Sequence, residues 1–230
     1  LDEAKRLGII DRIGHDVAAE VGDADLVLLA TPVAQMGDIF ARIAPHLGAQ
    51  TLVTDGGSTK CDVVAAARAN LAGKLAQFVP AHPIAGAEKS GAAAAMADLY
   101  QGKRVVLAPL PENPAPSVAR VRQAWEACGA VVSELTPEEH DGVFAAVSHL
   151  PHLLSFALVH DLAQRDNKDL LLSFAASGFR DFTRIAASSP EMWRDISLAN
   201  REALLCELQQ YMNELSTLKQ ALADNDAAKL

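Results

Sequence analysis

Three short segments of this 230-residue chain carry side chains that could do chemistry. The first is Asp55-Gly-Gly-Ser-Thr-Lys60, between a predicted strand and the start of a predicted helix. Loops after the carboxyl ends of strands line the ligand crevice of α/β sheets, and a helix N-terminus offers unpaired N–H groups. The GxxxxGK[ST] spacing of a P-loop is absent. The segment therefore predicts either a ligand-binding turn or a tight turn with Ser58 as the helix N-cap.

The second segment is His82-Pro-Ile-Ala-Gly-Ala-Glu-Lys-Ser-Gly91, which also follows a predicted strand. A histidine held by a following proline at a strand end can act as a base at neutral pH. Glu88 could bond to or orient a neighbouring group. The alternative is a histidine with a purely structural role.

The third segment combines Ser148-His-Leu-Pro-His152 with Gly178-Phe-Arg-Asp-Phe-Thr-Arg184. His149 and His152 share a helix face, a spacing that also permits a metal site. However, HExxH is absent and no carboxylate stands at ligand spacing. The sequence therefore predicts no metal.

Arg180 and Arg184 are four residues apart on a predicted helix. Arginines bind carboxylates through paired hydrogen bonds, and the neighbouring Phe182 and Ile185 would lower the local dielectric around Arg184. The alternative is an ion pair with Asp181 or a solvated face.

The elements that must position these residues change in character near residue 136. Before it, apolar strands are predicted at 26–31, 51–54, 78–79, 103–108 and 131–132, and helices at 36–47, 58–69 and 116–128. Strands that are apolar on both faces and separated by helices predict a doubly wound parallel sheet, covered on both sides. A helical tail ending at Gly8 precedes them.

The remainder is predicted to be all helical. Thr136-Pro-Glu-Glu139 forms a capping box that opens a helix, and helical periods follow at 144–162 with a kink at Pro151, at 170–176 and at 189–222. We therefore divide the chain into domains 1–136 and 137–230. The second has more apolar stripes than a small bundle can bury, which predicts a two-fold homodimer.

Composition limits the partners. The chain has 29 acidic and 20 basic residues and a net charge of −9, so no nucleic-acid or membrane partner is expected, and an acidic ligand must meet local cations. The 3 cysteines form no CxxC pair, which favours a reducing cytoplasm. No signal peptide or membrane-length apolar run is expected.

The segments together resemble the prephenate and arogenate dehydrogenases of tyrosine biosynthesis, including the dual-substrate cyclohexadienyl dehydrogenases. The motifs that carry the resemblance, in the family's order, are Ala30-Thr-Pro-Val33, Asp55–Lys60, His82–Gly91, Ser148–His152, Gly178–Arg184 and Met192-Trp-Arg-Asp195. The resemblance implies a nicotinamide-binding Rossmann domain followed by a helical domain that completes the site and forms a dimer.

The implied reaction is oxidative decarboxylation of prephenate or arogenate, giving 4-hydroxyphenylpyruvate or tyrosine, with hydride transfer to NAD or NADP. The resemblance makes His82 the base for the ring hydroxyl, while Ser58 bridges that hydroxyl and the nicotinamide. It places Thr31, Pro32 and Val33 beside the nicotinamide ribose.

The resemblance also implies the substrate contacts. Arg184 would hold a carboxylate, and Ser148, His152 and Arg180 would lie near the side-chain end of the substrate. Glu88 is a further expected substrate contact.

The sequence departs from the family pattern at three places. The strand, GxGxxG turn and second strand with which members begin do not occur from Leu1 onward, so the first βαβ portion is expected to be absent and cofactor binding by this chain weak. Ala87 stands where a hydroxyl residue is frequent, and Arg180 where lysine is common.

Three alternatives stay open. One is another Rossmann dehydrogenase of the hydroxyacid type, which usually relies on a helix-borne lysine. The second is a metal hydrolase that uses His149 and His152. The third is a catalytically inactive dimerisation module.

Overall fold

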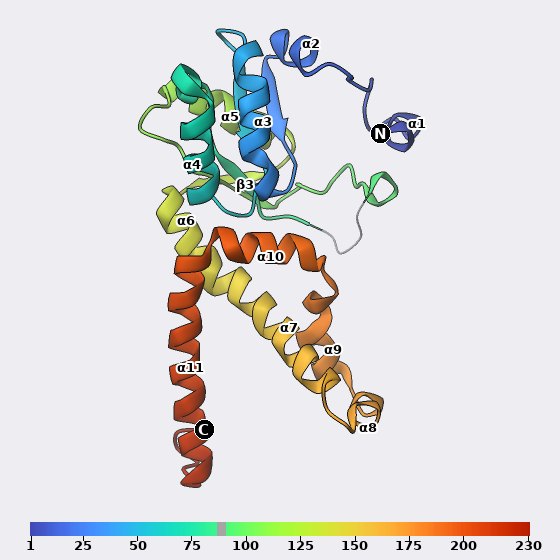
Figure 1. Cartoon of the computed structure of the whole chain (residues 1–230), viewed down its shortest axis with the longest axis vertical. Helices are drawn as coiled ribbons and strands as arrows, with labels where there is room; N and C mark the ends of the chain where they lie inside the picture. Colours follow the sequence, from blue (N-terminus) through green and yellow to red (C-terminus); the bar gives the residue numbers. More distant parts are fainter. Residues whose placement is uncertain (87–90) are drawn as a thin grey trace. The chain divides into compact units, whose positions relative to one another are not determined.

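A computed structural model describes residues 1–86 and 91–230 (Figure 1). The chain forms two compact units, Leu1–His140 and Asp141–Leu230, which are described separately. The domain boundary at 136/137 stays a prediction.

The described residues of unit 1 form five strands. They are β1 (Leu26–Leu29), β2 (Leu52–Asp55), β3 (Ala81–Pro83), β4 (Arg104–Leu107) and β5 (Val131–Glu134). Strand β1 pairs in parallel with β2, and β4 in parallel with β5. The chain just before β3 joins β2 through a parallel bridge from Phe78 to Val53, and the Val79 N–H donates to the Val53 carbonyl at 2.9 Å.

Helices flank these strands. Those of unit 1 are α1 (Asp2–Arg6), α2 (Val17–Gly22), α3 (Met36–Ile43), α4 (Cys61–Asn70) and α5 (Ala115–Ala127), and α6 (Pro137–Phe144) begins in it. Gly8 follows α1 with φ +71°, as expected of a glycine that ends a helix. The predicted α/β class is confirmed.

One pairing differs from the predicted all-parallel sheet. Strand β3 runs antiparallel to β4, with His82 opposite Val106. Parallel neighbours need a crossover, usually a helix. The described part of the connection from β3 to β4 contains only the 3₁₀ turn Ala92–Ala94, so an antiparallel return is the natural outcome.

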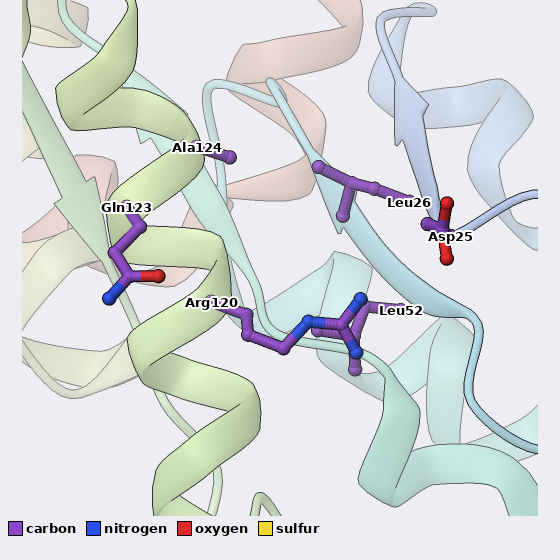
Figure 2. A pocket seen from close by; sticks show the side chains of 6 residues that line it. All are labelled: Asp25, Leu26, Leu52, Arg120, Gln123 and Ala124. Atoms are coloured by element: carbon purple, nitrogen blue, oxygen red, sulfur yellow. The ribbon is translucent and has the colours of Figure 1, made fainter.

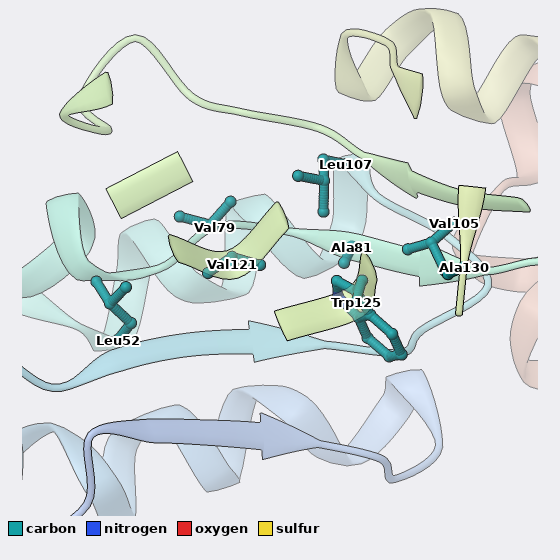
Figure 3. Close-up of a cluster of buried hydrophobic side chains, with 8 residues drawn as sticks. All are labelled: Leu52, Val79, Ala81, Val105, Leu107, Val121, Trp125 and Ala130. Carbon is teal, nitrogen blue, oxygen red and sulfur yellow. The ribbon is translucent and has the colours of Figure 1, made fainter. Parts of the chain in front are cut away.

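One cluster of the core of unit 1 lies between the sheet and α5, and further buried side chains lie on α3 and α4. Figure 3 shows the buried side chains of this cluster, which are Leu52, Val79, Ala81, Val105, Leu107, Val121, Trp125 and Ala130. The core therefore fixes the strands that carry the candidate site. The prediction that both faces of every strand are covered is wrong for β1, where Leu26 is 39% and Leu28 47% exposed.

Unit 2 is helical throughout its length, as predicted. Its elements are the end of α6, a π-helical segment (Ala145–His149), α7 (Leu150–Ala163), α8 (Lys168–Ser173), α9 (Ser177–Thr183), a 3₁₀ turn (Arg184–Ala187), α10 (Pro190–Ala199) and α11 (Arg201–Ala223).

Two irregularities interrupt the helices of unit 2. The π-helical segment ends at His149, two residues before Pro151, whose ring lacks an N–H and crowds the carbonyl four residues earlier. The wider turn gives that carbonyl room, and the kink at Pro151 stays a prediction. The single helix predicted over 189–222 is instead two helices, broken at Asn200. The side chain of Asn200 turns inward and donates to the Asp141 carbonyl at 2.8 Å.

The continuous helix Pro137–Ala163 contains an 18-residue window of mean hydropathy 1.6, which suffices by length and composition to cross a membrane. This differs from the expectation of no such run. Only 28% of the window is buried, and a helix in a protein core or interface meets the same criteria. Exposed apolar side chains also occur on α11, at Leu205, Met212, Leu215, Leu218 and Leu222.

Candidate functional site

The loops after β1 and β2 and the end of β3 meet at one edge of the sheet. The Gly56 N–H donates to the Leu29 carbonyl at 3.0 Å, and a Cβ on Gly56 would lie 3.7 Å from Pro83. These strand segments run in parallel, so their carboxyl ends coincide. The fold thus brings Ser58 and His82 to the edge where α/β sheets bind ligands.

A buried ion pair joins these loops. Asp55 Oδ2 accepts from Lys60 Nζ and, at 2.9 Å, from the Gly57 N–H, while Oδ1 accepts from the Ala81 N–H at 2.9 Å. Lys60 Nζ also donates to the Ala81 carbonyl at 2.8 Å. Both charged side chains are completely buried. The pair therefore holds Gly57 and Ala81, which directly precede the predicted catalytic residues Ser58 and His82.

Ser58 is partly exposed in the turn between Asp55 and Lys60. Its interpretation as an N-cap is wrong, because α4 begins at Cys61 with Lys60 in the capping position. A Cβ on Gly57 would come within 2.9 Å of both Asp55 Oδ2 and the Val33 side chain, so the close packing of this turn requires glycine.

The ring of His82 lies against a second histidine. His82 Nδ1 is 2.8 Å from Nε2 of His140, and the ring centroids are 5.0 Å apart. His140 is fully buried in α6, whereas His82 is partly exposed. A hydrogen-bonding partner at one ring nitrogen of a histidine determines which of its two nitrogens carries the hydrogen.

The segment after β1 contains the residues expected beside the nicotinamide ribose, and their role stays a prediction. Thr31 is partly buried, Pro32 is exposed, and Val33 is buried at the start of a 3₁₀ turn. The hydroxyls of Thr31, Thr54 and Thr59 are buried without a hydrogen-bond partner. Each of these oxygen atoms is enclosed by the surrounding protein, so none of them is accessible to a ligand in this arrangement.

A cavity of about 340 Å³ lies elsewhere in unit 1 (Figure 2). Asp25, Leu26, Leu52, Arg120, Gln123 and Ala124 line it. Leu26 and Leu52 begin their strands, so this cavity is at the end of β1 and β2 opposite to Ser58.

In unit 2, His152 stacks on Trp193, with ring centroids 3.5 Å apart and an interplanar angle of 18°. His152 Nδ1 lies 2.8 Å from the Ser148 carbonyl, which can only accept, so Nδ1 carries a hydrogen. Burial lowers the pKa of His152, as does the charge of Arg184, and the bond to Ser148 opposes them. The neutral ring therefore offers an acceptor at Nε2.

The two candidate arginines do not share one helix. Arg180 is on α9, whereas Arg184 begins the following 3₁₀ turn. Both are exposed in the single chain. The expected apolar shielding of Arg184 is wrong for Phe182, which is 50% exposed. The electrostatic effect on His152 nonetheless places Arg184 near that ring.

His149 has a separate environment from His152. It is buried, its Nδ1 lies 3.1 Å from Asn200 Nδ2, and its ring meets Trp193 edge-on at 6.0 Å. Within residues 1–86 and 91–230, no three His, Cys, Asp or Glu side chains gather to hold a metal. The metal-hydrolase alternative gains no support from them.

Sequence reasoning missed three features of the site. The pairing of Asp55 with Lys60 is hidden inside a motif, and His140 is 58 residues from its partner His82. Trp193 carries a visible signal, since it lies in a family motif, but its stacking partner is not apparent. Glu88 and the substituted position Ala87 lie outside the described residues.

Comparison with known families covers almost the whole chain. Residues 1–134 match the nucleotide-binding domain of prephenate dehydrogenase, and residues 136–230 match its dimerization domain.

Individual dehydrogenases are also similar to this chain over most of its length. A cyclohexadienyl dehydrogenase of Zymomonas mobilis is 37% identical over 98% of this chain and 77% of its own, and a prephenate dehydrogenase of Bacillus subtilis is 38% identical over 99% and 62%. The crystal structure of Aquifex aeolicus prephenate dehydrogenase with hydroxyphenyl propionate and NAD⁺ superimposes with a TM-score of 0.90 at 39% identity, covering 97% of this chain and 78% of that one. This chain belongs to the prephenate dehydrogenase family.

Proposed function

We propose that the protein containing this chain oxidatively decarboxylates prephenate, arogenate or both, and transfers hydride to NAD or NADP. The observation that carries the proposal is the buried Asp55–Lys60 pair, which holds the segments of Ser58 and His82 together at the ligand-binding edge of a family member. The names of the relatives supply the substrate class.

The ring hydroxyl of the substrate would lose its proton to Nε2 of His82, the ring nitrogen that does not face His140. The carbon bearing that hydroxyl loses hydride, which bound nicotinamide accepts. The ring carboxylate leaves as carbon dioxide, and its bonding electrons complete the aromatic ring while the ring oxygen takes back a proton from His82. Ser58 would orient the hydroxyl by hydrogen bonding.

The cofactor fits the edge that carries Thr31, Pro32 and Val33. The match of residues 1–134 to a nucleotide-binding domain supports this assignment.

Unit 2 carries the other proposed substrate contacts. Arg184 is the proposed carboxylate receptor, because a guanidinium pairs with two oxygens at once. Ser148, His152 and Arg180 would contact the side-chain end. The role of Glu88 stays a prediction.

The chain carries a dimerization domain, and we propose that it forms a two-fold homodimer. The exposed apolar side chains of α11 support this assembly. The cysteines Cys61, Cys128 and Cys206 are exposed, which supports a reducing compartment, and we propose the cytoplasm.

The test is a comparison of four assays, in which prephenate and arogenate are each incubated with NAD and with NADP. The proposal predicts reduced nicotinamide in at least one of them. Reduction with simple hydroxy acids but not with either cyclohexadienol would favour a hydroxyacid-type dehydrogenase. No reduction with any substrate by a folded protein would favour the inactive dimerisation module.

A further inference from the structure

The contact between His82 and His140 constrains the proton of each ring. Two ring nitrogens 2.8 Å apart must share one hydrogen, with one nitrogen donating and the other accepting. If His140 donates, neutral His82 carries its own hydrogen on Nε2 and cannot accept another there. If His82 donates from Nδ1, its Nε2 has a lone pair. Only the second arrangement makes His82 a base.

We propose that His140 is a positioning residue that accepts the Nδ1 hydrogen of His82 and thereby holds Nε2 of His82 ready to take the substrate's proton. This inference rests on the proposed function. It adds a residue that acts through His82 and does not itself touch the substrate.

The placement of His140 is rigid. The Thr136 backbone N–H donates to the Glu139 carboxylate at 2.8 Å, and the Glu139 N–H donates to the Thr136 hydroxyl at 3.1 Å. The His140 N–H then donates to the Thr136 carbonyl at 2.9 Å. This capping box fixes the first turn of α6 and the direction of the His140 side chain.

The backbone of His82 is also held in place, by contacts separate from those that hold His140. Strand β3 holds its backbone against β4, and the Asp55–Lys60 pair binds both the N–H and the carbonyl of Ala81, the preceding residue. Backbone and ring are therefore held by separate elements of unit 1.

A neutral acceptor suits this role. When His82 takes the substrate's proton, its Nδ1–H becomes a charge-assisted donor, and the bond to His140 strengthens. The arrangement follows the general logic of a base oriented by a third group, with an imidazole in the orienting position.

The first measurement is the tautomer of His82 by ¹⁵N NMR, in the whole protein without substrate. The inference predicts a hydrogen on Nδ1 and a lone pair on Nε2. In His140→Phe, which removes the acceptor, the Nε2–H form should become populated. His46→Phe, at an exposed position of the same unit, is the matched control and should leave the signal of His82 unchanged.

The second measurement is turnover. His140→Phe should lower kcat by at least ~10-fold, and by no more than the ~10²–10⁴-fold that complete general-base help is worth, while KM stays within about threefold. His140→Gln keeps an acceptor oxygen and should retain the Nδ1–H form and most of kcat. It also serves if His140→Phe does not fold.

An Nε2–H form of His82 in the unaltered protein would overturn the inference. So would a folded His140→Phe protein with unchanged tautomer and kcat, or a His140→Gln protein that loses the Nδ1–H form. Failure of the proposed function is distinct, because the unaltered protein would then turn over neither cyclohexadienol while the NMR result stood.

Discussion

Asp55 and Lys60, five residues apart, form an ion pair with both side chains fully buried, and these side chains also bond to the backbone of Gly57 and Ala81. The pair therefore connects the end of β2 to the start of β3. It stabilises the relative placement of two loops that the sequence separates.

Breaking this ion pair should destabilise unit 1 strongly. Asp55→Asn leaves the Lys60 ammonium buried without a counter-charge, and Lys60→Met does the same to the carboxylate. Each should lower the free energy of unfolding by about 3–5 kcal/mol, measured by urea titration. The double variant should lose much less than the sum.

The matched control is an exposed pair of the same unit. Arg68 and Glu112 bond at 2.5 Å with side chains 46% and 38% exposed. Arg68→Met should cost less than about 1 kcal/mol. Equal losses for Lys60→Met and Arg68→Met would contradict the role given to the buried pair.

Four of the five described strands overlap the predicted ranges, because apolar runs and turn residues report local structure directly. The strand predicted at 78–79 is wrong, since β3 spans Ala81–Pro83, so His82 lies within a strand and not after one. Gly8 and Thr136–Glu139 behave as their residue types require. The antiparallel β3 was not predictable, since pairing direction depends on how the chain returns, which the apolar pattern of residues 81–83 does not encode.

Arg184 should matter for substrate binding more than for turnover. Arg184→Ala should raise KM by roughly 30-fold or more, the equivalent of ~2 kcal/mol for a lost charged pair, with a smaller effect on kcat. Arg184→Lys should recover only part of the loss, because an ammonium lacks the planar fork.

Arg194→Ala is the control, since Arg194 is exposed on α10 and bonds to Asp195. If Arg184→Ala leaves KM within about threefold and instead destabilises the fold, Arg184 is a structural residue, and Arg180 becomes the next candidate.

His152 should make stability depend on pH. Burial lowers its pKa, so the unfolded chain binds this proton at a higher pH than the folded chain does. The free energy of unfolding should therefore decrease as pH falls below about 6.5, until the lowered pKa is reached. Urea titrations of His152→Gln should show a shallower decrease between about pH 7 and 5.

Glu139 provides a comparison in a different pH window. Its bonds to Thr136 lower its pKa, so its contribution to the free energy of unfolding is present at neutral pH and is lost only as pH falls below about 4.5.

If the free energy of unfolding of His152→Gln depended on pH as it does in the unaltered protein, His152 would not be held neutral by the fold.

The exposed face of α11 should lie in the dimer interface. Leu205, 54% exposed in the single chain, is expected to be covered by the second copy. Leu205→Glu should shift the protein toward monomer at micromolar concentration, measured by light scattering, because a buried unpaired carboxylate is costly. Gln209→Glu, also exposed on α11, tests for a general effect of charge. A dimer unaffected by Leu205→Glu would remove that residue from the interface.

The candidate site was predictable only as separate motifs. His82, Ser58 and Arg184 stood out because their residue types and neighbours suit chemistry. His140 and Asn200 did not, because each acts through a partner more than 50 residues away, 58 for His140 and 51 for Asn200 to His149. Long-range contacts of this kind leave no periodic signal in a single sequence.

The most direct test of the account is the ratio of carbon dioxide released to nicotinamide reduced, with prephenate or arogenate as substrate. The account predicts one carbon dioxide per reduced nicotinamide, and a fall in both rates by about 10²–10⁴-fold in a folded His82→Asn protein. Reduction without carbon dioxide, or equal rates in the unaltered protein and His82→Asn, would contradict it.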